Sequence, residues 1–186
     1  EGDMGGHAFY NGGGGAVLAM NMRNVTIGNS IFSKCSAPNG AGGAVLVMLE
    51  EVLPRTLAQR YSSTDVRRFQ IFDSTFQDSQ AGYAGGAVAF VSNESTTSNT
   101  EWLISTTNMT GGKVLNELGT SVFGGGVHCG FGGNTEQIST SFQNFNATQN
   151  ELKCSTDADR LCTASGGGVN FRFDKAAIDA RMSFDG

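Results

Sequence analysis

Apolar residues recur at alternate positions in five segments of the chain, and each segment follows a pair of glycines. The pairs begin at Gly14, Gly42, Gly85, Gly125 and Gly167, so successive copies start 28, 43, 40 and 42 residues apart. A period of two is typical of a β-strand with one buried face. We predict that the same three positions of every copy face a common core. These positions are Ala16, Leu18 and Met20; Ala44, Leu46 and Met48; Ala87, Ala89 and Val91; Val127, Cys129 and Phe131; Val169, Phe171 and Phe173.

A second family of apolar segments follows the first four copies. Each member joins a short strand to another apolar residue through a polar turn, so each repeat carries at least two strands. When like strands stack, their backbone groups bond from one repeat to the next. The repeat therefore predicts an all-β fold, a right-handed parallel β-helix of about four to five coils. The segments are Val25–Phe32, Phe69–Phe76, Trp102–Met109 and Ile138–Phe145.

The repeat runs through nearly the whole chain, so we expect one domain over residues 1–186 that is a segment of a longer solenoid. An amphipathic pattern between Val52 and Tyr61 indicates a short helix or a loop inserted between strands. The spacing of the copies predicts inserted loops near residues 49–68, 92–100, 111–122 and 149–165.

The composition agrees with a glycine-turned β repeat and argues against several kinds of partner. The chain has 27 Gly, 2 Pro and only 16% charged residues, with a net charge of −5. Phosphate binding needs a basic surface, so nucleic acid is not an expected partner. No stretch approaches the roughly 18 consecutive apolar residues of a membrane span.

The glycine motif and the second apolar clusters resemble the repeats of polymorphic outer-membrane proteins and related β-helix surface proteins. Those repeats carry a GGA[IVL] motif and an FxxN motif in each coil, and their solenoid is of the pectin-lyase-like kind. The resemblance covers nearly the whole chain, and it implies surface display or adhesion without enzyme activity. The first motif stands here at Gly14–Val17, Gly42–Val45 and Gly85–Val88, and degenerate copies of the second stand at Phe32–Cys35, Phe76–Ser79 and Phe145–Thr148.

The cysteines and the glycosylation sequons favour a location outside the cell. Cys154 and Cys162 bracket a polar loop and are the candidate disulfide, with two free thiols as the alternative. Candidate N-glycosylation sites occur at Asn24, Asn93, Asn108 and Asn146, and Asn93 lies in a polar run that we expect to be exposed. Glycosylation would mark a secreted eukaryotic protein; the alternative is a bacterial surface protein with fortuitous sequons. In either case we expect an extracellular, cell-surface location.

The active sites of β-helix lyases and hydrolases need clustered carboxylates, or calcium-binding Asp beside a basic residue. Asp73 and Asp78 flank Phe76, but the alignment stacks Asn29 and Thr106 on Asp73, and Lys34 and Gly111 on Asp78. His128 and Cys129 are adjacent in a strand, so their side chains should point to opposite faces. We therefore expect no enzyme, no metal and no cofactor.

One set of residues suggests a partner. In the first three copies the positions between the inward ones are also apolar, and an exposed apolar stripe of that size marks an interaction site; an insert at 49–68 folding over it is the alternative. We expect an extracellular structural or adhesive repeat protein, part of a surface glycoprotein or filament that contacts other proteins, further coils or glycans. The alternatives are a carbohydrate-active β-helix enzyme and a carbohydrate-binding module. The stripe is Val17, Ala19, Val45, Val47, Val88 and Phe90.

Overall fold

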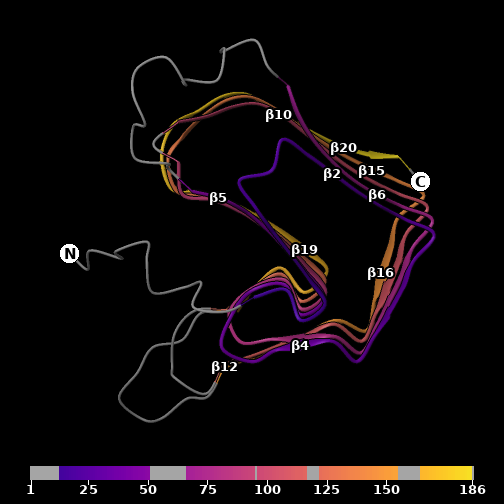
Figure 1. Cartoon of the computed structure of the whole chain (residues 1–186). Coiled ribbons are helices and arrows are strands. Elements are labelled where there is room, and N and C mark those ends of the chain that lie inside the picture. The colour runs from indigo at the N-terminus through magenta and orange to yellow at the C-terminus, as the bar shows by residue number, and fades with distance from the viewer. Residues whose placement is uncertain (1–12, 51–65, 95, 117–121, 155–163, 186) are drawn as a thin grey trace, which may run out of the picture.

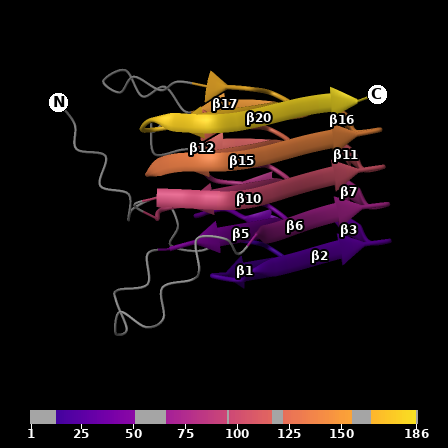
Figure 2. The same ribbon diagram turned by 90° about the horizontal axis from the view of Figure 1, so that it is seen from above.

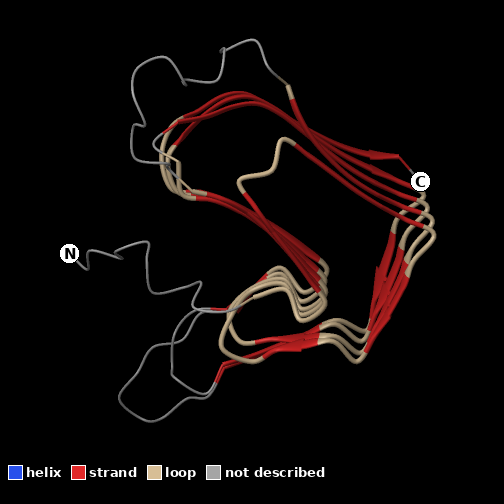
Figure 3. Ribbon diagram, viewed as in Figure 1, coloured by secondary structure: helices blue, strands red, loops and turns tan. Residues whose placement is uncertain are grey.

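The fold is all-β in the residues that the computed structural model describes, which are 13–50, 66–94, 96–116, 122–154 and 164–185. These residues form parallel sheets only, and they contain no helix (Figure 3). They accordingly contain no helix long and apolar enough to cross a bilayer.

Two long sheets of five strands each form most of the stack. In both, every strand pairs in parallel with its equivalent from the next repeat. Sheet I is β1 (Val17–Met20), β5 (Val45–Leu49), β9 (Val88–Ser92), β14 (Val127–Phe131) and β19 (Val169–Phe173). Sheet II is β2 (Asn24–Gly28), β6 (Arg67–Phe72), β10 (Thr96–Ser105), β15 (Asn134–Gln143) and β20 (Ala177–Asp185).

Three smaller sheets complete the circuit of each repeat. Sheet III is β3 (Ile31–Ser33), β7 (Thr75–Gln77), β11 (Asn108–Thr110) and β16 (Asn146–Thr148). Sheet IV is β4 (Ser36–Ala37), β8 (Gln80–Ala81), β12 (Lys113–Asn116) and β17 (Glu151–Cys154). Sheet V is β13 (Val122–Phe123) and β18 (Ala164–Ser165), and single bridges at Gly13, Ala41 and Ala84 continue it down the stack.

We call one circuit through these sheets a rung, so that β1, β5, β9, β14 and β19 begin rungs 1 to 5. Figure 1 looks along the stack, where equivalent strands lie over one another, and Figure 2 shows the rungs side by side. The arrangement is consistent with a β-solenoid. The expected all-β repeat of stacked parallel strands is thus confirmed at this level.

Sheets I, II and III enclose the main core. Aromatic side chains stack across rungs: the rings of Phe69 and Trp102 are 4.2 Å apart between centroids, and those of Phe32 and Phe76 are 4.7 Å apart. Phe90 of sheet I reaches across to Trp102 of sheet II, with a centroid separation of 3.9 Å. These side chains join the walls of the core to each other as well as the rungs.

The face of sheet I that points into this core differs from our expectation in the first three rungs. In rungs 4 and 5 three glycines precede the strand, and the first of them, not the second, is equivalent to the first glycine of rungs 1 to 3. Val127 therefore pairs with Val88 and not with Ala87. The first glycine of the motif has a positive φ in every rung, and in rung 4 that glycine is Gly124. A Cβ at Gly42, the rung 2 equivalent, would lie 2.0 Å from the carbonyl oxygen of Val45, so the motif requires glycine there.

A register error of one residue exchanges the two faces of a strand. The predicted partner surface is therefore wrong, because its six residues point into the main core or pack against it. Val45, Val47, Val88 and Phe90 are at most 2% exposed, and Ala19 and Val17 lie beside them. Of the residues expected to be inward in rungs 2 and 3, Ala44 and Ala87 belong to the main core. The other four form a second core on the opposite face of sheet I; they are Leu46, Met48, Ala89 and Val91.

The turn between sheets II and III uses the same backbone conformation in every rung that contains it. The φ values lie between 46° and 51° at the four equivalent residues, which are Asn29, Asp73, Thr106 and Asn144. The next turn repeats this pattern at Lys34, Asp78, Gly111 and Gln149. The expected stacking of Asp73 with Asn29 and Thr106, and of Asp78 with Lys34 and Gly111, is confirmed. Asn and Asp adopt this region more readily than other non-glycine residues because they bond locally to the backbone.

Several further expectations are corrected by the structure. The fourth copy of the FxxN motif does not begin at Phe145, because Ala147 is the residue that pairs with Met109. The segment 92–100 is not an exposed loop: β10 begins at Thr96, and the side chains of Ser92 and Thr97 are buried. The expected inserts near 111–122 and 149–165 are also wrong in part, because Lys113–Asn116 and Glu151–Cys154 are the strands β12 and β17 of sheet IV. Residues 51–65, 117–121 and 155–163, with the helix or loop proposed near Val52, lie outside the described residues.

The observed register of sheet I can be tested with two truncations. We expect Phe90→Ala to lower the free energy of unfolding by about 3–5 kcal/mol, because it removes a large buried ring. Leu18→Ala should cost about 1 kcal/mol or less, because that side chain is 50% exposed. Urea denaturation of both variants measures the difference, and a larger loss for Leu18→Ala would contradict the register.

The repeated turn predicts a stabilising substitution. Thr106 is β-branched and exposed at a positive φ of 47°, where its equivalents are Asn or Asp. We expect Thr106→Asn to raise the free energy of unfolding by about 1 kcal/mol. Thr26→Asn, on an exposed strand position, is the control and should give no gain. Equal effects of the two substitutions in thermal denaturation would contradict the explanation.

Candidate functional site

The outer face of sheet I changes in character along the stack. In one column the side chains run from Leu18 and Leu46 through Ala89 to His128 and Asn170. The neighbouring column runs from two methionines through Val91 and Gly130 to Arg172. Rungs 1 to 3 are therefore aliphatic on this face, whereas rungs 4 and 5 are polar.

The chain that returns from sheet IV packs against the aliphatic part of this face. Ala41 and Ala84 are buried against Leu46 and Ala89, and Tyr83 and Phe123 pack at the edge of the same cluster. Figure 1 shows this return segment folded back toward sheet I, beside β19. The second core therefore fixes the position of sheet V relative to sheet I.

The polar end of the face holds a connected group of side chains, which we call the His128 cluster: His128, Asn170, Ser165, Phe123 and Arg172. The Oδ1 atom of Asn170 accepts a hydrogen bond from Nδ1 of His128 at 3.0 Å, and its Nδ2 donates to the hydroxyl of Ser165 at 3.2 Å. The Phe123 ring stacks on the imidazole with a centroid distance of 5.5 Å. Residues from β13, β14, β18 and β19 are thus joined.

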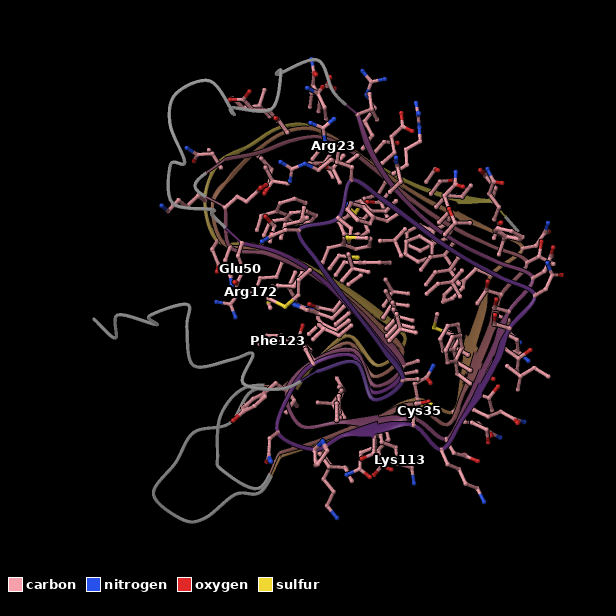
Figure 4. All side chains as sticks on the ribbon, viewed as in Figure 1. Arg23, Cys35, Glu50, Lys113, Phe123 and Arg172 are labelled. Carbon is pink, nitrogen blue, oxygen red and sulfur yellow. The ribbon has the colours of Figure 1, made fainter. Side chains whose placement is uncertain are left out.

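Arg172 closes the outside of the cluster. Its guanidinium carbon lies 5.0 Å from the centroid of the Phe123 ring, a cation–π arrangement, and its Nε donates to Oδ1 of Asp174. Figure 4 shows Arg172 and Phe123 at the same side of sheet I. The charge of Arg172 is therefore held over the aromatic ring and offset by a neighbouring carboxylate.

Burial lowers the pKa of His128 to about 4, and the hydrogen bond with Asn170 opposes that effect only in part. The imidazole is therefore neutral at pH 7, with a proton on Nδ1. A neutral, 3% exposed ring serves here as a fixed hydrogen-bond donor between β14 and β19. The cluster consequently joins rungs 4 and 5 through hydrogen bonds between buried polar side chains.

The other candidate residues lie apart from this cluster. Cys129 points into the main core, opposite His128 as expected, and burial raises the pKa of its thiol. Asp73 and Asp78 are exposed in the two repeated turns. Among the residues that the structure describes, no group of His, Cys, Asp and Glu is arranged to hold a metal ion. Cys162 lies outside those residues, as does the side chain of Cys154, so their pairing stays a prediction.

The sequons differ in their surroundings. Asn24, Asn108 and Asn146 are exposed on strands β2, β11 and β16. Asn93 is only half-buried, and its backbone N–H donates to the carbonyl of Leu49. Asn108 and Asn146 are direct partners in sheet III, a juxtaposition that the sequence spacing alone did not reveal.

The two ends of the described stack expose apolar side chains. At the rung 1 end these are Leu18, Met20, Met22 and Ile31, with exposed fractions between 42% and 79%. At the rung 5 end, Met182 and Phe184 continue columns that point into the core, and the ring of Phe184 stacks on Phe142 at 4.9 Å. Both have more than half of their surface exposed.

Sequence reasoning missed the His128 cluster, although one signal for it was present. His128 and Asn170 occupy the same position of two successive copies, where the earlier copies have aliphatic residues. When apolar residues of one column are replaced by hydrogen-bonding residues in two neighbouring copies, a polar contact between those two rungs is expected. Comparisons of the chain with protein-family models, curated proteins and solved structures find no match.

The buried imidazole predicts a stability that depends on pH. Because the folded-state pKa of His128 is below the unfolded value of 6.5, the unfolded chain takes up the proton first as the pH falls. Stability should therefore be full above pH 6.5 and should decrease toward pH 4, by about 3 kcal/mol from this group. Urea denaturation of the chain and of His128→Gln at several pH values isolates the effect. Parallel pH profiles for the two proteins would show that His128 is not buried in the neutral form.

Proposed function

We propose that the chain is a right-handed parallel β-helix and serves as an extracellular structural or adhesive module. Right-handed crossovers are strongly preferred when parallel strands of one sheet are connected, which supports the handedness. The continuous parallel pairing of sheets I and II through five rungs supports a load-bearing scaffold, since every strand of these sheets bonds to its equivalent in the next rung.

The observation that carries the proposal is the pair of open ends. The described strands of rung 1 and rung 5 each leave one edge unpaired, and their core columns end in exposed apolar side chains. An edge of this kind is a template for another strand, and exposed apolar surface favours association. We infer that the module joins further β-rungs at its ends, from its own chain or from another copy, to build a longer surface filament.

The register gives the geometry of such a joint. One column on the outer face of sheet II runs through Thr26, Gln70, Leu103, Ser141 and Ser183. If two copies continue this column end to end, Ser183 of one copy lies against Thr26 of the next. The two Cα atoms would then be about 4.8 Å apart, the spacing of adjacent strands.

The outward surfaces are suited to contacts outside the cell. On the outer face of sheet II, an exposed polar column runs through Arg68, Glu101, Ser139 and Arg181, with an ion pair between Arg68 and Glu101 at 2.8 Å. Polar side chains repeated at the strand spacing can bond to a regular polymer such as a glycan or to a neighbouring filament. Contacts with other surface proteins or with glycans are therefore part of the proposal.

Cysteine cross-linking tests the joint. Thr26→Cys and Ser183→Cys are made in separate chains, and the two variants are mixed under mild oxidation. We expect a covalent heterodimer, because a Cα separation of about 4.8 Å suits a disulfide. Peptide mapping by mass spectrometry distinguishes this bond from one that involves the native cysteines.

The control replaces Thr26→Cys by Ser139→Cys, which is also exposed but lies on β15, a strand that is paired on both sides. This variant should not cross-link to Ser183→Cys. A dimer formed by Ser183→Cys alone would show that like ends meet, and a monomeric chain without any cross-link at high concentration would refute end-to-end association. Electron microscopy of the untreated protein then shows whether the product is a filament.

A further inference from the structure

Sheet III brings two glycosylation sequons onto one surface. Asn108, Met109 and Thr110 form β11, and Asn146, Ala147 and Thr148 form β16. Met109 is fully buried, so the flanking Asn108 and Thr110 point outward. The two asparagines are exposed, as is Thr148.

The two sequons superpose residue for residue. Asn108 pairs with Asn146, Met109 with Ala147, and Thr110 with Thr148. Their Cα atoms are therefore separated by about 4.7–4.9 Å, the distance between neighbouring strands. The two side-chain amides leave the same face in the same direction, although 38 positions separate them in the sequence.

We propose that Asn108 and Asn146 are alternative sites for a single N-linked glycan in the folded chain. A branched glycan is bulky and must extend from the surface into solvent. Two such groups attached one strand spacing apart would occupy the same space over sheet III. The inference rests on the proposed extracellular location, since this modification occurs in the secretory pathway.

The chemistry is a group transfer to the side-chain amide. The anomeric carbon of the oligosaccharide forms a bond with Nδ2 of the asparagine, while its bond to the phosphate oxygen of a polyisoprenyl diphosphate donor breaks. The amide loses one proton, and the lipid diphosphate leaves. The secreting cell supplies the donor, so this chain contributes only the acceptor nitrogen and the hydroxyl of the sequon.

The other sequons do not compete in this way. Asn24 lies on sheet II, where its register partner is Arg68. Asn93 is half-buried next to Glu94, whose carboxylate accepts from Arg67 at 2.6 Å. The constraint is therefore specific to the pair on β11 and β16.

The test is a count of glycans on chain secreted from eukaryotic cells. Asn24→Gln and Asn93→Gln are introduced together so that only the sheet III pair remains. We expect intact-mass spectrometry to find one glycan per folded molecule, and glycopeptides to show it divided between Asn108 and Asn146. Adding Asn108→Gln or Asn146→Gln should leave one glycan, located at the remaining site.

A matched control keeps Asn146 and moves the second acceptor one rung further away. Thr75 and Gln77 are the register partners of Asn108 and Thr110 in β7, so Thr75→Asn with Gln77→Thr places a sequon there. Combined with Asn108→Gln, it leaves two sequons separated by two strand spacings, and the glycan count should rise from one to two.

Two results would overturn the proposal. One is a folded, secreted protein in which most molecules carry glycans at both Asn108 and Asn146. The other is a chain that carries no glycan at either site even when the neighbouring site is removed. The cross-linking of unglycosylated chain from bacterial expression is independent of both outcomes, so a failure here is distinguishable from a failure of the proposed end-to-end module.

Discussion

In-register pairing of each strand with its equivalent in the next rung is the constraint on which the rest of the structure depends. It places equivalent residues of successive repeats about 4.8 Å apart, so that side chains of the same position contact one another along a column. Aromatic residues in such columns stack, as Phe69 does on Trp102 and Phe142 on Phe184. The same pairing brings surface asparagines together on sheet III, which no local interaction would do.

The turns maintain this register. A glycine with positive φ opens the sheet I strand in every rung, and a residue with positive φ ends the sheet II strand in rungs 1 to 4. Because these turns superpose, their backbone amides also bond from rung to rung, for example from Gly42 N–H to the carbonyl of Ala84. Insertions are accommodated between the strands, and the columns are unaffected by the variation in repeat length.

Sheet I is unusual in this stack because both of its faces are covered over much of its length. One face contributes Val47 and Phe90 to the main core, and the other contributes Leu46 and Ala89 to the second core. In rungs 4 and 5 the second face becomes polar, and the bond between His128 and Asn170 replaces aliphatic packing. Within the described residues, the large exposed apolar side chains therefore lie at the ends of the stack and not along the side of sheet I.

The sequence by itself determined the all-β repeat, the succession of the sheet I strand and the second apolar segment in each rung, and the stacking of Asp73 and Asp78 with their equivalents. These depend on glycine turns and on apolar residues spaced along the chain, which are local properties. Only the tertiary structure decided which face of sheet I points into the main core. Every residue from Val45 to Leu49 is apolar, so alternation of apolar and polar residues cannot show which of them face the core. The run of three glycines at Gly124–Gly126 also permits two alignments of the repeat. Pairing with the neighbouring rungs removes this ambiguity, because a shift of one residue would exchange the two faces of the strand.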